Sequence, residues 1–431
     1  MNKLIKDSLV VGFALFAMFF GAGNIIFPPS IGLTGGEDWW LGFLAYFFAD
    51  IGLAVIAFLA LINSGNIDRY ESSIFWRLGP WTSRIMAGLV IFAICYIAGP
   101  RTAMVSYELG VVPVFGESEY GLMIYSALYF FVAWLFCIKQ SKIVDYIGKY
   151  LTPVLVIGLV ILIIVGMVNP LGEIDGPAKI SNVWYSGLID GYQTIDSLAI
   201  VTTGVLISIS LSAKGYETPQ SKSKAVIYAS FITAILMFIV YGGLCYLGAT
   251  VSTQYGADMQ HGTLVVTIFQ RLLGYPGSVA LGIVVLLACL TTGLALAGIL
   301  ASYLERVTNG RLKYNVMVTL ACFSFAMVAN IGLSNILKLA IPVILVLYPA
   351  LLVMVILSFW NNKIKNDNIF RISVGFAVIY AILEVLKGQG VEPLNIIEIL
   401  PLSAHGFGWI VPAAIGAVLG FFIKPKAETE G

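Results

Sequence analysis

Twelve long apolar runs, separated by short polar loops, make up most of this 431-residue sequence. An α-helix needs about 20 apolar residues to cross the roughly 30 Å hydrocarbon core of a bilayer. Charged residues make up only 11% of the chain, whereas soluble domains contain about 25%. The sequence therefore predicts an all-α polytopic membrane protein with 12 transmembrane helices. The runs cover residues 9–31, 40–62, 84–110, 121–138, 145–169, 188–211, 223–250, 277–304, 312–331, 335–359, 368–387 and 407–423.

Positive charges divide unevenly between the two sides of the predicted bundle. Of the 24 Lys and Arg residues, nineteen lie on the side of the two termini, three lie in the alternate loops and two lie inside predicted spans. Lys and Arg accumulate in the cytoplasmic loops of membrane proteins. The bias therefore predicts a multi-pass protein with both termini in the cytoplasm.

The sequence lacks the common patterns that carry enzyme chemistry. It contains no HExxH zinc motif, no GxSxG nucleophile motif and no phosphate-binding Gly-Lys-Ser/Thr loop. Each of the five cysteines lies inside an apolar run, as expected of small buried hydrophobic residues. We therefore predict no enzyme activity, and any active transport would need an ion gradient or another subunit. The net charge of +1 gives no indication of nucleic acid binding.

A helix-breaking motif, Gly21–Asn24, lies in the first run and is followed by Pro28 and Pro29. Glycine costs a helix interior about 1 kcal/mol, and proline is best tolerated in a first turn. Two half-helices satisfy both constraints, one ending near Phe20 and the other starting near Asn24 with the prolines early in it. Irregular backbone at this depth is tolerated only where it is buried or lines a cavity.

The predicted interruption would expose two kinds of backbone group. Carbonyls near Ala17 and Phe20 can coordinate a cation, and the amides of Gly21, Ala22 and Gly23 can hold a carboxylate at the positive end of the outer half-helix. The alternative interpretation is a glycine pair that allows close helix packing.

A second interruption is predicted in the sixth run, at Gly191–Ser197. It contains Asp196 near mid-membrane, where an ionised side chain costs about 3 kcal/mol. Asp196 is therefore a functional candidate that could neutralise a substrate ammonium, lie near a coupling cation or carry a proton. The alternative is an aspartate hydrogen-bonded within the bundle.

The eighth run carries Ala288, Thr291 and Thr292 near its centre. These positions share one helix face, and one carbonyl with two hydroxyls suits a small cation that prefers oxygen ligands. The alternative is that both threonines bond back to their own helix.

A long outer segment, residues 252–276, is predicted to form an amphipathic helix on the outer side. Its apolar residues at helical spacing are Leu264, Val265, Ile268, Phe269 and Leu272. Residues 392–403 are interpreted either as a shorter helix of this kind or as a surface loop.

Three segments resemble the bacterial branched-chain amino acid:cation symporters, the BrnQ-type carriers: Phe19–Pro29, Gly191–Ala199 and Ala98–Arg101. The resemblance spans the whole chain. It implies a secondary active symporter that imports Leu, Ile and Val with Na⁺ by alternating access, with Li⁺ as a substitute ion and H⁺ as the alternative. It implies location in the bacterial plasma membrane, with the amino acid and the lipid bilayer as partners and no obligatory protein partner.

The resemblance also implies an architecture and a set of binding roles. The chain would form a single transporter domain, 1–431, with a LeuT-like fold: interrupted helices 1 and 6, inverted repeats of five helices at about 7–170 and 184–360, and two appended helices within 368–423. The implied substrate-binding residues are Phe19, Gly21, Ala22, Gly23, Asn24, Thr194, Asp196 and Ser197. The implied cation ligands are Ala17, Phe20, Ala288, Thr291 and Thr292.

Other functions remain open on the sequence. A carrier for another neutral amino acid, a proton-coupled carrier and a non-transporting membrane sensor all fit the same pattern of helices. A channel fits poorly, because the chain has too few polar faces to line a continuous pore. Asp50 and Glu108 receive no role, and Arg101 is interpreted as part of a structural ion pair or of an outer gate.

Overall fold

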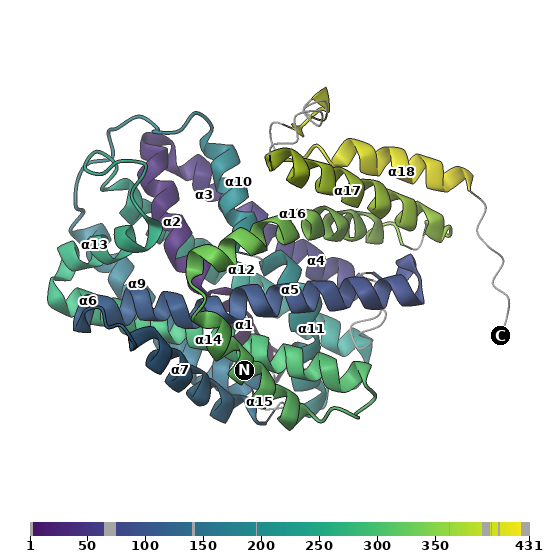
Figure 1. Cartoon of the computed structure of the whole chain (residues 1–431), viewed down its shortest axis with the longest axis horizontal. Coiled ribbons are helices and arrows are strands. Elements are labelled where there is room, and N and C mark those ends of the chain that lie inside the picture. The colour runs from purple at the N-terminus through teal and green to yellow at the C-terminus, as the bar shows by residue number, and fades with distance from the viewer. Residues whose placement is uncertain are drawn as a thin grey trace. The chain divides into compact units, whose positions relative to one another are not determined.

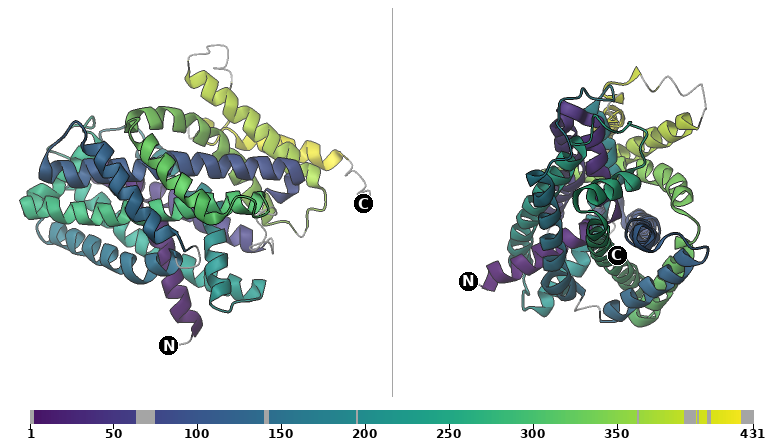
Figure 2. Two further views of the ribbon diagram at one scale, coloured as in Figure 1. Left: turned by 60° about the horizontal axis from the view of Figure 1, so that its bottom comes forward. Right: turned by 90° about the vertical axis from the view of Figure 1, so that its left-hand side faces the viewer.

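A computed structural model of the chain shows helices and turns, with no β-strand in the residues that it describes (Figures 1 and 2). The described residues are 3–63, 75–139, 143–194, 196–361, 363–389, 397, 399–403 and 406–423. The predicted all-α class is therefore confirmed for this part of the chain.

Each predicted apolar run contains one helix or two consecutive helices. The helices are α1 (Lys3–Phe19), α2 (Ala22–Gly35), α3 (Trp39–Phe47), α4 (Leu53–Asn63), α5 (Pro80–Ser106), α6 (Val112–Phe115), α7 (Gly121–Cys137), α8 (Ile143–Tyr146), α9 (Thr152–Val168), α10 (Val183–Gln193), α11 (Asp196–Ala213), α12 (Pro219–Ala249), α13 (His261–Leu273), α14 (Tyr275–Val307), α15 (Tyr314–Ala329), α16 (Leu333–Ser358), α17 (Asp367–Gly388) and α18 (Ile410–Phe422). Short 3-10 turns occupy Gly36–Asp38 and Trp76–Leu78.

Three π-helical turns connect consecutive helices. They are Phe48–Gly52 between α3 and α4, Tyr107–Val111 between α5 and α6, and Ile147–Leu151 between α8 and α9. Such turns occur often at functional sites. The first of them carries Asp50, whose side chain is fully buried.

The chain divides into two compact units. One comprises Met1–Val55 and Ile94–Leu337, and the other comprises Ile56–Ala93 and Lys338–Gly431. In the second unit α17 packs along α18, and Arg77 forms an ion pair of 2.8 Å with Asp367. Every residue of the site described below belongs to the first unit.

Six segments of the described chain are long and apolar enough to cross a membrane. They are Ala22–Phe58, Trp81–Phe115, Ile143–Val168, Gln220–Ala249, Tyr275–Val307 and Asp367–Gly388. Shorter apolar helices add Gly121–Cys137, Tyr314–Ala329, Pro342–Ser358 and Ile410–Phe422. Large exposed side chains follow one face of α9 at Val154, Ile157, Ile161 and Ile164, as expected of a helix that faces lipid.

Within the first unit, α14 is an interior helix, because 83% of its most apolar window is buried. The first helix, α1, packs against α12 and α14. Both views in Figure 2 show the N-terminal end of α1 projecting beyond its neighbours. The deeper half of α1 is enclosed by protein from Val11 to Phe19, with Phe13 alone half-buried.

The amphipathic helix predicted within residues 252–276 is present as α13, His261–Leu273. Leu264, Val265, Ile268 and Phe269 are buried, whereas Leu272 is half-buried. Residues 392–403 lie largely outside the described residues, and residues 397 and 399–403 form 3-10 positions, turns and a bend.

Candidate functional site

The first apolar run contains a non-helical step of two residues. Helix α1 ends at Phe19 and α2 begins at Ala22, so that Phe20 and Gly21 lie between them. The Gly21 amide donates to Asn24 Oδ1 at 3.2 Å, which satisfies one of the amides that a helix start leaves without a backbone partner. The step is buried on all sides, where unpaired backbone groups are tolerated only around a cavity.

The prolines of this run lie deeper in α2 than the sequence predicted. Because α2 starts at Ala22, two residues before the predicted position, Pro28 and Pro29 fall in its interior and not near its start. At this level α2 approaches the backbone of α12 closely, since a Cβ added to Gly248 would lie 1.9 Å from the Pro29 carbonyl oxygen.

The sixth run is also divided, immediately before Asp196. Helix α10 ends at Gln193 and α11 begins at Asp196; Thr194 is a turn residue, and Ile195 lies outside the described residues. Thr194 Oγ1 lies 2.6 Å from the Gly191 carbonyl oxygen. Asp196 thus occupies the first turn of α11, where its carboxylate faces the helix's positive end.

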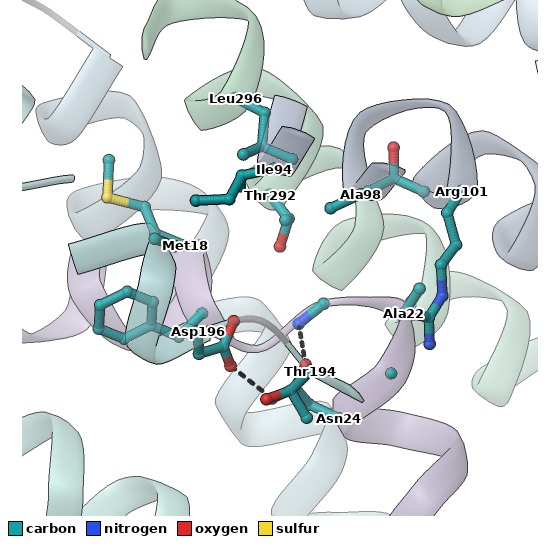
Figure 3. Close-up of a pocket in the computed structure, with 15 residues that line it drawn as sticks. Met18, Ala22, Asn24, Ile94, Ala98, Arg101, Thr194, Asp196, Thr292 and Leu296 are labelled. Carbon is teal, nitrogen blue, oxygen red and sulfur yellow. Dashed lines mark hydrogen bonds between the residues drawn. The ribbon is translucent and has the colours of Figure 1, made fainter. Parts of the chain in front are cut away.

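Asn24 joins the two divided runs through its side-chain amide. Asn24 Nδ2 lies 2.7 Å from Asp196 Oδ2, 3.2 Å from Asp50 Oδ2 and 2.5 Å from the Tyr241 hydroxyl. Figure 3 shows the side chains of Asn24 and Asp196 facing each other. Two buried carboxylates therefore share one amide group.

Asp50 and Tyr241 were not among the predicted site residues. Asp50 accepts from Thr194 Oγ1 at 2.9 Å and from the Tyr241 hydroxyl at 2.5 Å. The sequence signal was the carboxylate of Asp50 in the middle of an apolar run. Its partners come from residues 144 and 191 positions away, and no local pattern specifies such contacts.

A small cavity lies beside the two interruptions (Figure 3). Seven predicted substrate-binding residues line it: Phe19, Gly21, Ala22, Gly23, Asn24, Thr194 and Asp196. The side chain of the eighth, Ser197, lies outside the described residues. Sequence reasoning missed several further lining residues: Met18, Ile94, Ala98, Arg101, Thr102, Ala199 and Leu296.

Four of the five predicted cation ligands meet beside this cavity. The Thr291 hydroxyl lies 2.8 Å from the Ala17 carbonyl oxygen and 2.9 Å from that of Ala288. The Thr292 hydroxyl lies 3.3 Å and 3.2 Å from the same two oxygens. All four residues are buried. The threonines therefore bond both to their own helix and across to the end of α1.

The fifth predicted ligand is Phe20, whose side chain is held by ring stacking. It stacks on Phe16 and Tyr241, with ring centroids 5.2 Å and 6.2 Å away. The four-oxygen cluster fits a small cation, which favours oxygen ligands in a buried polar setting. Such an ion would be transported cargo, and the two threonine hydroxyls would turn their lone pairs toward it.

The two glycines of the motif lie against side chains of the site. A Cβ at Gly21 would lie 3.0 Å from Thr292 Oγ1, and a Cβ at Gly23 would lie 2.9 Å from Arg101 Nη2. The glycines thus allow close approach, as the packing interpretation proposed. Their nearest neighbours, however, are the side chains of Thr292, Arg101 and Phe27, and not the backbone of a neighbouring helix.

Helix α13 contacts α2 through His261. Its Nδ1 lies 2.5 Å from the Ser30 hydroxyl, and its ring meets that of Phe27 edge-on at 5.5 Å. Burial lowers the pKa of His261 below its ordinary value, and the positive charge of Arg101 shifts it further in the same direction. His261 is therefore held neutral near pH 7.

The chain is similar in sequence to a family of bacterial carriers. The family model described as "Branched-chain amino acid transport protein" matches residues 4–427. The chain is 31% identical to "Branched-chain amino acid permease BrnQ" of Bacillus subtilis (strain 168), over 98% of each chain. It is 34% identical to "Branched-chain amino acid transport system 3 carrier protein" of Pseudomonas aeruginosa, over 95% of this chain and 94% of that protein. These relatives are named as permeases and carriers, in agreement with the prediction of no enzyme activity.

Two solved structures share the fold at low sequence identity. A Na⁺-coupled sialic acid symporter in a substrate-bound outward-open state has a TM-score of 0.60 and 13% identity, over 97% of this chain and 90% of that one. Mhp1, a nucleobase-cation-symport-1 family transporter in a closed conformation, has a TM-score of 0.61 and 14% identity, over 96% and 91%. At this identity the likeness concerns the fold alone.

Proposed function

Because the chain belongs to the family of branched-chain amino acid transport proteins, we propose that it is a secondary active symporter that imports leucine, isoleucine and valine with Na⁺. The predicted family is thereby confirmed, and the ion and the direction are our proposal. The observation that carries the proposal is the oxygen cluster formed by Ala17, Ala288, Thr291 and Thr292 beside the cavity.

This cluster would couple the ion to the substrate through the end of α1. Thr292 lies against Gly21, which borders the cavity. A Na⁺ ion bound by the Ala17 carbonyl and the two threonine hydroxyls would fix the distance between α1 and α14. The start of α2 would then be ordered for an amino acid in the cavity. The amides of Ala22 and Gly23 would remain for its carboxylate, because the Gly21 amide already donates to Asn24.

We further propose the membrane arrangement that the sequence predicted. Helices α1 and α2 would form one interrupted span, α10 and α11 another, and the chain would cross the bilayer 12 times with cytoplasmic termini. The inverted repeats would cover about 7–170 and 184–360. Alternating access would move these interrupted spans against α14. One cation entering down about 100 mV releases roughly 2.3 kcal/mol, and a tenfold gradient adds about 1.4 kcal/mol.

A proton-coupled carrier is a second candidate, favoured by the acid pair. Asp50 and Asp196 converge on the single amide group of Asn24, and two carboxylates this close favour binding of one shared proton. Proton coupling would then use the acid pair in place of the oxygen cluster.

Uptake by proteoliposomes distinguishes these candidates. Purified protein is reconstituted, and uptake of labelled leucine is measured under an inward gradient of Na⁺, Li⁺ or H⁺. We expect accumulation under Na⁺, weaker accumulation under Li⁺ and competition by unlabelled isoleucine and valine. Accumulation under H⁺ alone would identify the second candidate, and a lack of leucine uptake under every gradient would refute both.

A further inference from the structure

Arg101 is a buried cation that the proposed mechanism does not yet use. It lies on α5, the residue is 4% exposed, and it lines the cavity. Figure 3 shows the side chain extending from α5 toward the start of α2, with the guanidinium beside Ala22.

The guanidinium has unused hydrogen-bonding capacity. Within the described part of the chain it forms no ion pair, and its buried Nε has no hydrogen-bond partner. The guanidinium lies against the Phe27 ring, whose centroid is 5.6 Å from the guanidinium carbon, and against Gly23, where an added Cβ would lie 2.9 Å from Nη2. A buried charge is costly unless it is paired, so a group that enters the cavity is the natural partner.

The first amides of α2 lie in the same part of the cavity as the Arg101 guanidinium. The first amides of a helix lack backbone partners and carry the positive end of its dipole. The Gly21 amide is satisfied by Asn24, which leaves the amides of Ala22 and Gly23 beside the Arg101 guanidinium. One helix start and one buried guanidinium therefore converge on a single part of the cavity, where an anionic group would be bound by both.

The acids of the site have other partners. Asp50 accepts from Thr194 and Tyr241, and Asp196 accepts from Asn24. Asp196 lines the same cavity as Arg101. The cavity therefore has a cationic part at Arg101 and an anionic part at Asp196, and a zwitterion presents the complementary charges.

We propose that the Arg101 guanidinium, together with the first amides of α2, binds the carboxylate of the transported amino acid. This inference rests on the proposed function and adds a specificity determinant to it. Arginine suits the role because its planar fork can donate two parallel hydrogen bonds to one carboxylate. Amino acids with a free carboxylate would be accepted, and their amides and alcohols would be rejected.

Competition binding tests the assignment. Labelled leucine is bound to the purified full-length protein in Na⁺ buffer, and unlabelled leucine, leucinamide and leucinol compete. We expect the wild-type protein to prefer leucine over leucinamide by about 100-fold, as charged hydrogen bonds to a buried partner allow. In Arg101→Gln, leucine affinity should fall about 100-fold while leucinamide affinity is unchanged or rises, because a positive charge that repels it has been removed.

Two further variants keep the test decisive. Arg77→Gln is the matched control, since Arg77 is a buried arginine held by Asp367 and two carbonyls outside the cavity. It should keep the wild-type ratio of leucine to leucinamide affinity. If Arg101→Gln does not fold, Arg101→Lys decides: the loss of the planar fork should lower the ratio about tenfold, and an unchanged ratio overturns the assignment.

The other outcomes separate this inference from the proposed function. If wild-type protein binds no leucine, the proposed function fails and the inference fails with it. If the wild type binds leucine but Arg101→Gln weakens leucine and leucinamide equally, Arg101 has only a packing role. If leucine affinity depends on chloride and is lost in chloride-free buffer, the guanidinium holds an inorganic anion, which also overturns the assignment.

Discussion

At the scale of single residues, the site depends on which groups the two interruptions bring together. Asn24 is the clearest case: its side chain caps Gly21 through one atom and meets two carboxylates through the other. One residue thus links the helix start of α2 to the acid pair. Sequence reasoning placed Asn24 at the interruption, but its contacts depend on Asp50 and Asp196, which come from elements distant in the chain.

The cation cluster yields a prediction for Thr292→Ala. Removal of the hydroxyl takes one of four oxygens from the cluster, so we expect the Na⁺ concentration for half-maximal leucine uptake to rise about tenfold, equivalent to about 1.4 kcal/mol. Leucine affinity at saturating Na⁺ should change much less. The measurement is initial uptake by proteoliposomes as a function of Na⁺.

The matched control for this prediction is Thr319→Ala on α15. The Thr319 hydroxyl accepts from Trp134 Nε1 at 2.9 Å and lies outside the cluster, so its Na⁺ dependence should equal that of the wild type. An unchanged Na⁺ dependence in Thr292→Ala would remove this residue from the cation site.

At the scale of elements, Gly21 and Gly23 allow the start of α2 to lie close to α14 and α5 around the cavity. The sequence predicted interruptions at Gly21–Asn24 and Gly191–Ser197, because Gly-rich or acidic steps are unusual in an apolar run; α1 ends at Phe19 and α10 ends at Gln193. It did not show that Pro28 and Pro29 fall inside α2, since the start of a buried helix is fixed by the Asn24 contact. Nor did it show the π-helical turn that carries Asp50, since such turns have no local signature of their own.

Enlarging Gly23 tests the interruption directly. A leucine at this position must displace Arg101 and Phe27, whose atoms would lie within 3.1 Å of the new Cβ. We therefore expect Gly23→Leu to abolish leucine uptake while the protein still inserts into the membrane at normal yield. Uptake per inserted molecule is measured in cells, with protein quantified by immunoblot.

Gly375→Leu on α17 is the corresponding control, because no neighbouring atom would lie within 4 Å of its new Cβ. It should leave uptake unchanged. Normal uptake by Gly23→Leu would show that the start of α2 is not part of the binding site.

The contact of α13 with α2 predicts a dependence of stability on pH. Because the pKa of His261 is lowered in the folded protein, its neutral form contributes stability that is present above the unfolded pKa of about 6.5. This stability is lost as pH falls toward the folded pKa. We expect the thermal unfolding midpoint of the wild-type protein to decrease as the pH is lowered below 6.5. His261→Gln should lack the part of this decrease that comes from protonation of His261. Equal pH profiles for the two proteins would contradict the prediction.

At the scale of the whole molecule, hydropathy accounts for more of the described helices than any motif does. The apolar runs coincide with helices because a membrane span must satisfy its backbone internally, and that requirement is visible in local composition. The acid pair and Arg101 were visible as isolated charges in apolar runs. The sequence did not reveal that these residues lie at one site, because their proximity depends on how helices distant in sequence pack together.

The proposed topology can be tested by chemical labelling. The five native cysteines are all buried, so an impermeant maleimide should label the wild-type protein weakly. New cysteines at two exposed positions, Asp258 before α13 and Asn309 after α14, would then report on opposite sides of the membrane. If both termini are cytoplasmic, Asp258→Cys is labelled in intact cells, whereas Asn309→Cys is labelled only after permeabilisation. The reverse pattern would show that the termini lie outside the cytoplasm and would refute the proposed topology.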